Sequence, residues 1–120
     1  HKAKSYVFAL RGSGHAKAWP LDYFEKAPVI NDTAGALRLT LIGNVATRTV
    51  RAYRTTGQTF AMGRKPGTLD ADGEAWQMTE AALVGPNGVQ LTRLPGHIAY
   101  WFAWSGYLGA RGEVATPPKR

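Results

Sequence analysis

The chain has 120 residues, of which 44% are hydrophobic, and this suits one domain with one core. It contains no cysteine, which excludes disulfides, zinc–thiolate sites, iron–sulfur clusters, covalent c-type haem and thiol nucleophiles. The net charge of +7 favours an anionic partner. Because the 14 glycines and 7 prolines are scattered, we expect many short elements joined by tight turns, and therefore a mainly β fold.

Alternation of apolar and polar residues predicts short strands in the first half of the chain. We expect them at residues 6–10, 16–21, 37–42 and 47–54. One helical turn is expected at residues 22–26, and residues 31–35 (NDTAG) have the Asx and glycine chemistry of a turn. In the run 47–54, Val50 and Ala52 should share one face, with Thr49, Arg51 and Tyr53 on the other.

In the second half, residues 55–58 should close a hairpin onto 59–62, and residues 64–67 should form a loop. A second helical turn is expected at residues 79–83, where Thr79 could cap and Glu80 would favour the positive helix end. Further extended segments are expected at 89–94 and 97–104. These elements predict a single domain over residues 1–104, a small sandwich or partly open barrel of antiparallel strands, followed by a loosely structured tail over 105–120.

The charges are unevenly placed along the sequence. Between residues 34 and 69 there are six basic residues and no acidic one, and four acidic residues follow directly, namely Asp70, Asp72, Glu74 and Glu80. We expect an electrically two-sided molecule whose basic face meets nucleic acid, an anionic membrane surface or an acidic protein. A solvated strand face with long charged side chains is the alternative interpretation.

The motifs of the common catalytic classes are missing. There is no His-x-x-x-His pair, no Gly-rich phosphate loop and no Gly-x-Ser-x-Gly elbow, and the three serines stand in no motif. The acidic stretch 69–74 (LDADGE) lacks the spacing of a calcium-binding EF-hand, so we expect a turn with solvated carboxylates. The pattern favours a non-catalytic protein.

Two histidines are candidate ligands. His97 follows a Pro-Gly turn beside aromatic residues, where it could ligate copper or a non-covalent haem, or bind a ligand by a hydrogen bond. The alternative is a histidine bonded to a neighbouring carbonyl at the edge of the core. His1, if it is the mature amino terminus, could bind copper through its amine and imidazole together with a second histidine.

The aromatic run 100–104 (YWFAW) predicts a strand that is buried on one face and partly covered on the other. The alternative is that one tryptophan is an exposed contact residue. No stretch reaches the roughly 20 apolar residues needed to span a bilayer, and no signal-peptide pattern opens the sequence. If the protein is exported, we expect this sequence to be a mature or truncated form.

Taken in order, several short motifs resemble one known family. They are VFALRGSGHAKAWPLDYFEKAPVINDTAG, VRAYR, Phe60, LDADGEAWQMTEAALVG and VQLTRLPGHIAYWFAW, covering about residues 5–104. This set is similar to the bacterial domain-of-unknown-function family 3179. The resemblance implies a compact, β-rich, exported domain, often periplasmic and sometimes found beside c-type cytochrome domains. Many members carry a Cys-Pro-x-Cys-Gly segment, whereas residues 41–44 here are Leu-Ile-Gly-Asn.

Two hypotheses of function follow. The first is a non-catalytic extracytoplasmic accessory domain that docks on other protein subunits with an acidic surface, in an assembly that carries cytochromes or is otherwise membrane-associated. The second is a metal- or ligand-binding, redox-related domain anchored on His97. The candidate contact residues are His97, Trp76, Trp101, Arg51, Arg54 and Arg93. A third hypothesis, nucleic-acid binding through Arg48, Arg51, Arg54 and Tyr53, is disfavoured for an exported domain.

Overall fold

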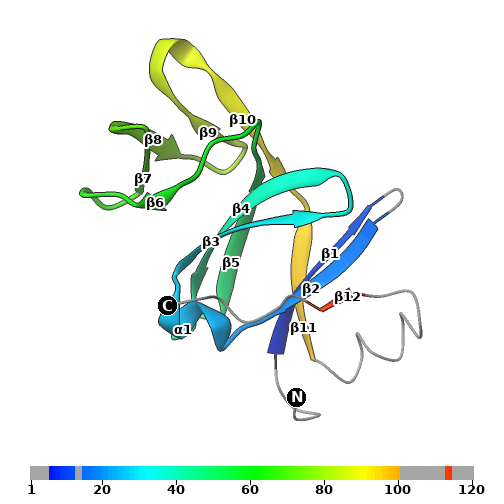
Figure 1. The fold of residues 1–120 in the computed structure, drawn as a ribbon. Coiled ribbons are helices and arrows are strands. Elements are labelled where there is room, and N and C mark those ends of the chain that lie inside the picture. Colours follow the sequence, from blue (N-terminus) through cyan, green and yellow to red (C-terminus); the bar gives the residue numbers. More distant parts are fainter. Residues whose placement is uncertain (1–5, 13–14, 101–112, 115–120) are drawn as a thin grey trace.

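The computed structural model describes residues 6–12, 15–100 and 113–114. These residues contain twelve strands, one short α-helix and one 3-10 turn (Figure 1). A four-stranded sheet has the order β11 (Gly96–Tyr100), β1 (Tyr6–Gly12), β2 (His15–Pro20) and β12 (Glu113–Val114). An eight-stranded sheet has the order β3 (Val29–Ala34), β4 (Leu37–Asn44), β5 (Thr49–Arg54), β10 (Gln90–Leu94), β9 (Ala82–Val84), β8 (Glu74–Met78), β7 (Thr68–Ala71) and β6 (Ala61–Met62). The predicted mainly β fold is confirmed.

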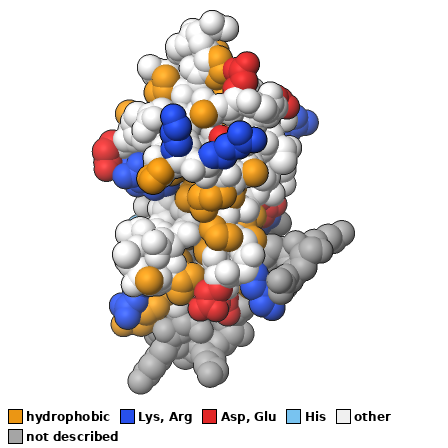
Figure 2. Space-filling model, turned by 90° about the vertical axis from the view of Figure 1, so that its left-hand side faces the viewer, with side chains coloured by type: hydrophobic (Ala, Val, Ile, Leu, Met, Phe, Trp, Pro, Cys, Tyr) orange, Lys and Arg blue, Asp and Glu red, His pale blue; other side chains and the backbone are white. Residues whose placement is uncertain are grey.

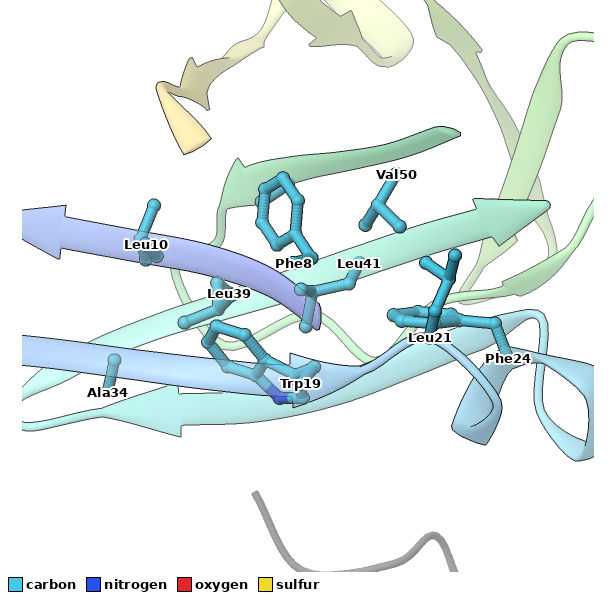
Figure 3. Close-up of a cluster of buried hydrophobic side chains, with 10 residues drawn as sticks. Phe8, Leu10, Trp19, Leu21, Phe24, Ala34, Leu39, Leu41 and Val50 are labelled. Carbon is cyan, nitrogen blue, oxygen red and sulfur yellow. The ribbon is translucent and has the colours of Figure 1, made fainter. Parts of the chain in front are cut away.

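The first hydrophobic core lies where the four-stranded sheet packs on β4 and β5 (Figure 3). Phe8 and Trp19 come from the smaller sheet, and their ring centroids are 6.3 Å apart. Leu39 and Leu41 face them from β4, and both are buried. The helix α1 (Tyr23–Lys26) adds Phe24 to this core, which confirms the helical turn expected at residues 22–26. The two sheets are therefore held together by continuous apolar packing.

The second core lies on the β6–β9 side of the eight-stranded sheet. It contains Tyr53, Phe60, Leu69, Trp76 and Leu83, all buried. Tyr53 was expected on the polar face of its strand, but it is fully buried, because both faces of β5 are covered at this position. A strand covered on both faces loses the simple alternation that a half-exposed strand shows.

Asn31 connects the two edges of the eight-stranded sheet. Its side-chain amide donates to the carbonyl oxygen of Phe60 at 2.8 Å, and its side-chain oxygen accepts from the Phe60 N–H at 2.9 Å. Asn31 lies on the edge strand β3, and Phe60 directly precedes the opposite edge strand β6. The amide thus takes the place of a neighbouring strand, and the sheet becomes nearly barrel-like.

Replacing Asn31 by alanine should lower the free energy of unfolding by about 1–3 kcal/mol, because the Phe60 N–H and carbonyl both lose their partner. Urea unfolding followed by circular dichroism measures this loss. Gln90→Ala, which removes an exposed amide from β10, is the matched control and should change stability by less than about 0.5 kcal/mol. Equal stability of the Asn31→Ala protein and this control would contradict the bridging role.

The two sheets also meet through a polar cluster around Asp32. The Asp32 carboxylate accepts from the indole N–H of Trp19 at 2.9 Å and lies 3.4 Å from the ammonium of Lys17. The Lys17 ammonium also donates to the Thr33 carbonyl at 2.8 Å, and its side chain is only 8% exposed. Lys17 and Trp19 belong to β2, whereas Asp32 belongs to β3, so the cluster ties one sheet to the other.

Three further local predictions are wrong. Residues 55–58 do not close a hairpin onto 59–62, because β6 pairs with β7 whereas β5 pairs with β4 and β10. Residues 31–34 form strand β3 rather than a turn, and the turn comes later, at Gly35, whose φ is +60°. Residues 79–83 form no helix, because the Thr79 hydroxyl accepts from the Ala82 N–H at 3.0 Å and closes a turn that leads into β9. The segment is also too short to gain a helix through local propensity alone. The 3-10 turn η1 (Pro86–Gly88) follows β9.

A hairpin that we did not predict joins β7 to β8. Asp72 and Gly73 have φ values of +54° and +77°, which is the left-handed pair that a tight two-residue hairpin needs. The Asp-Gly pair between alternating apolar residues carried this signal in the sequence. The expectation of a turn with solvated carboxylates at this place is confirmed, since Asp72 and Glu74 are exposed.

Part of the segment expected to be a loose tail belongs to a sheet. Glu113–Val114 form β12 and pair in parallel with Lys17 and Ala18 of β2. In the part of the chain that the structure describes, no helix is long and apolar enough to cross a membrane.

Candidate functional site

A groove of about 580 Å³ opens beside β5, β10 and β11. Its cationic or titratable lining consists of Arg48, Arg51, Arg93 and His97. Apolar side chains also line it, among them Phe8, Ile42, Met62, Met78 and Ile98, together with the polar residues Asn44 and Thr49. Figure 2 shows the face that lies on the left in Figure 1. Hydrophobic side chains gather in the middle of this face, and Lys and Arg side chains lie close to them. The groove therefore combines positive charge with apolar surface.

Arg51 is held in place by groups of the protein itself. It lies on β5, and its Nη1 donates to the Tyr53 hydroxyl at 3.5 Å and to the Thr79 carbonyl at 3.4 Å. The Tyr53 hydroxyl in turn donates to the same carbonyl at 2.9 Å. The hydrogen bond to Tyr53 raises the pKa of Arg51, and the nearby charge of Glu80 adds to this effect. The guanidinium therefore stays charged at any working pH.

Arg93 lies on β10, the neighbour of β5 in the sheet, and is paired there with Tyr53. Its Nη1 donates to the Glu80 carbonyl at 3.2 Å and to Oε2 of the Glu80 carboxylate at 3.0 Å. The other oxygen of that carboxylate, Oε1, accepts from Nη2 of Arg51 at 3.1 Å. One carboxylate thus bridges two guanidinium groups at the edge of the groove.

Arg48 is positioned by aromatic contacts. Its φ of +53° is uncommon for a residue other than glycine, and its guanidinium lies 4.4 Å from the centre of the Tyr6 ring. The Arg48 Nη1 donates to the Tyr6 hydroxyl at 2.8 Å, and Tyr6 stacks on Tyr100 with a centroid distance of 4.8 Å. The two hydroxyls lie 3.2 Å apart, and the hydrogen bond between them raises the pKa of Tyr100. The turn and the stacked rings hold the Arg48 guanidinium beside Tyr6, so Arg48 lines both the groove and a smaller recess that includes Tyr6.

His97 is exposed on β11, where it stands opposite Ala9 of β1. The preceding Gly96 is packed against the ring of Phe8, so a side chain at position 96 would clash with that ring. Among the described residues there is no group of three His, Cys, Asp or Glu side chains that could hold a metal ion. Because three arginines line the same groove, electrostatics there disfavour a cation and favour an anion.

The groove unites three of the six predicted contact residues, His97, Arg51 and Arg93. Trp76 does not line it and is 7% exposed, since its ring packs edge-on against Phe60 at 5.3 Å. Arg54 is exposed on β5 outside the lining. Trp101 and His1 lie outside the described residues.

The structure also bears on nucleic-acid binding. Tyr53, named as a contact for a base, is fully buried and donates its hydroxyl proton to the Thr79 carbonyl. A buried ring offers no face for base stacking. This candidate set therefore does not form a stacking surface.

The sequence interpretation missed Glu80 as a member of the site. Glu80 was assigned to the start of a helix, and nothing in the linear pattern pairs it with Arg51, which lies 29 residues earlier. The block of acidic residues after residue 69 was expected on another side of the molecule from the basic block. At this point the fold brings the two blocks together instead.

No curated protein and no solved structure matches the chain. Residues 41–44 are a regular part of β4 and pair with β5. The model of the family described as "Protein of unknown function (DUF3179)" matches residues 1–110 of the chain. Since this match covers most of the sequence, the chain belongs to that family, as its ordered motifs suggested.

Proposed function

We propose that this chain is a non-catalytic, extracytoplasmic interaction domain that binds an acidic partner protein in the groove lined by Arg48, Arg51 and Arg93. The observation that carries the proposal is that three arginines line one groove of about 580 Å³. We further propose that the partner belongs to, or neighbours, a cytochrome-containing or other membrane-associated assembly. Export and this association rest on what the family resemblance implies.

The chemistry of the lining supports a peptide segment as the bound group. Guanidinium groups bind carboxylates with two parallel hydrogen bonds, which adds geometric selectivity to charge attraction. The exposed Met62 and Ile98, which also lines the groove, offer apolar contact to side chains next to such a carboxylate. A ligand with alternating acidic and apolar side chains would meet both kinds of surface at once.

The net charge of the chain supports the same proposal. At +7 it would attract an acidic partner from a distance, and such steering weakens as salt screens the charges. The partly exposed guanidinium groups would then make the short-range contacts. We therefore expect binding that depends strongly on ionic strength.

A short fluorescein-labelled peptide of alternating glutamate and leucine is the test ligand, with binding followed by fluorescence anisotropy. Raising NaCl from about 50 to about 500 mM should weaken binding about tenfold or more. Arg51→Gln should weaken it about five- to tenfold at low salt, because a charged hydrogen-bond donor is lost. Arg54→Gln removes the same charge from the same strand outside the groove and is the matched control.

Equal losses in the Arg51→Gln and Arg54→Gln proteins would contradict the groove as the site. Tighter, salt-dependent binding of a single-stranded DNA oligonucleotide than of the peptide would favour nucleic acid instead. Stoichiometric metal in the native protein that is lost in His97→Ala would favour the metal-binding alternative. Recovery of the native protein in the cytoplasmic fraction would contradict the proposed location.

A further inference from the structure

Two guanidinium groups on neighbouring strands converge on a single carboxylate. Arg51 and Arg93 each donate to a different oxygen of Glu80, at 3.1 and 3.0 Å. This spacing is the one that a carboxylate from another molecule would need in order to contact both. Glu80 therefore marks the position of a carboxylate subsite on the groove lining.

The two arginines do not depend on Glu80 alone for their placement. Arg51 also donates to the Thr79 carbonyl, and Arg93 to the backbone carbonyl of residue 80. Backbone carbonyls remain when the side chain at position 80 is changed. The subsite should thus keep its geometry when the carboxylate of Glu80 is removed, which lowers the ordering cost for another ligand.

Glu80 itself is weakly attached. Its side chain is 84% exposed, whereas those of Arg51 and Arg93 are 36% and 32% exposed. It stands in the turn between β8 and β9, in a shallow recess of about 300 Å³ that shares Arg93 and Gly96 with the groove. Exposed ion pairs contribute little stability, so a competing carboxylate could displace this one at small cost.

We propose that Arg51 and Arg93 form a carboxylate-binding subsite of the groove and that Glu80 is its internal occupant, displaced by an acidic side chain of the partner protein. The inference rests on the proposed function and adds to it the ligand group, the two residues that bind it and the competitor built into the chain. Met62 and Met78 line the same groove. Because a peptide can contact these apolar side chains as well as the arginines, we expect a peptide rather than a free small anion.

Glu80→Ala is the decisive variant, measured with the labelled glutamate–leucine peptide. Removing the competitor should tighten binding about three- to tenfold at low salt, as expected for two exposed ion pairs. Glu74→Ala makes the same change in net charge at an exposed position at the start of β8 and should leave affinity within about twofold of the original protein. The double variant Glu80→Ala/Arg93→Gln should lose the gain.

Each outcome bears on one of the two proposals. If the peptide binds and Arg51→Gln weakens it, but Glu80→Ala behaves like Glu74→Ala, the internal occupant is wrong while the proposed function stands. If neither the original protein nor the Glu80→Ala variant binds the peptide, the proposed function fails and the subsite with it. Equal binding of a matched glutamine–leucine peptide would overturn the carboxylate as the ligand group.

Discussion

Replacing Asp32 by alanine should lower the free energy of unfolding by about 3 kcal/mol, as expected when a buried ion pair loses one partner. The carboxylate lies 3.4 Å from the ammonium of Lys17, which is 8% exposed, and accepts from the indole of the fully buried Trp19. The alanine variant removes these two contacts between β2 and β3, whereas the bond from Lys17 to the Thr33 carbonyl remains. The value lies at the low end of the range because Asp32 is 28% exposed and keeps some water.

Chemical unfolding at neutral pH measures this effect, and two further variants define its cause. Asp32→Asn keeps an acceptor for the Trp19 indole but removes the charge, so we expect a loss of about half that size. Asp22→Ala removes an exposed carboxylate that makes no side-chain capping bond to α1, and it should change stability by less than about 0.5 kcal/mol. Similar stability losses in Asp22→Ala and Asp32→Ala would refute the cluster.

Replacing Trp76 by alanine should cost about 3–5 kcal/mol, the usual range for emptying a buried tryptophan site. Its ring meets the Phe60 ring edge-on at 5.3 Å and lies directly over Gly85. Because the total stability of a domain is about 5–15 kcal/mol, thermal unfolding should occur at a much lower temperature. Calorimetry or circular dichroism measures the shift.

The same substitution separates a core residue from a contact residue. Since Trp76 lies in the second core and does not line the groove, affinity for the acidic peptide per folded molecule should not change. Trp76→Phe retains most of the packed volume and remains folded if the alanine variant does not, so it gives the same readout. A drop in peptide affinity for the folded Trp76→Phe protein would show that Trp76 contributes to peptide binding.

Local pattern sufficed where one face of a strand meets the core and the other meets water. The alternation in residues 37–42 predicted β4, and the polar and glycine-containing segment 64–67 predicted a loop without strand. The strand β8 was not predicted, although the Asp72-Gly73 pair indicates a hairpin. The same stretch also contains Thr79 and Glu80, a helix-capping pattern that favoured a helix over a strand.

Of the candidate contacts, Arg51, Arg93 and His97 do line one groove, whereas Arg54 and Trp76 do not. Residue type alone cannot make this distinction, because Arg51 and Arg54 stand on the same strand in the same charged run. Their surroundings differ through Thr79 and Glu80, which arrive from a turn far along the chain. Tertiary contacts therefore decide which of these arginines lines the groove.

The sequence by itself determined the strands β1, β2, β4, β5 and β10, the single apolar-rich domain and the family, because period-two alternation and ordered motifs act over a few neighbouring residues. Only the tertiary structure decided what the polar residues of those elements do. Asn31 and Asp32 have the composition of a turn, yet their partners are Phe60 and Trp19, which lie 29 and 13 residues away. Long-range pairing of polar side chains follows from how sheets close and pack, and this is not encoded in any local spacing.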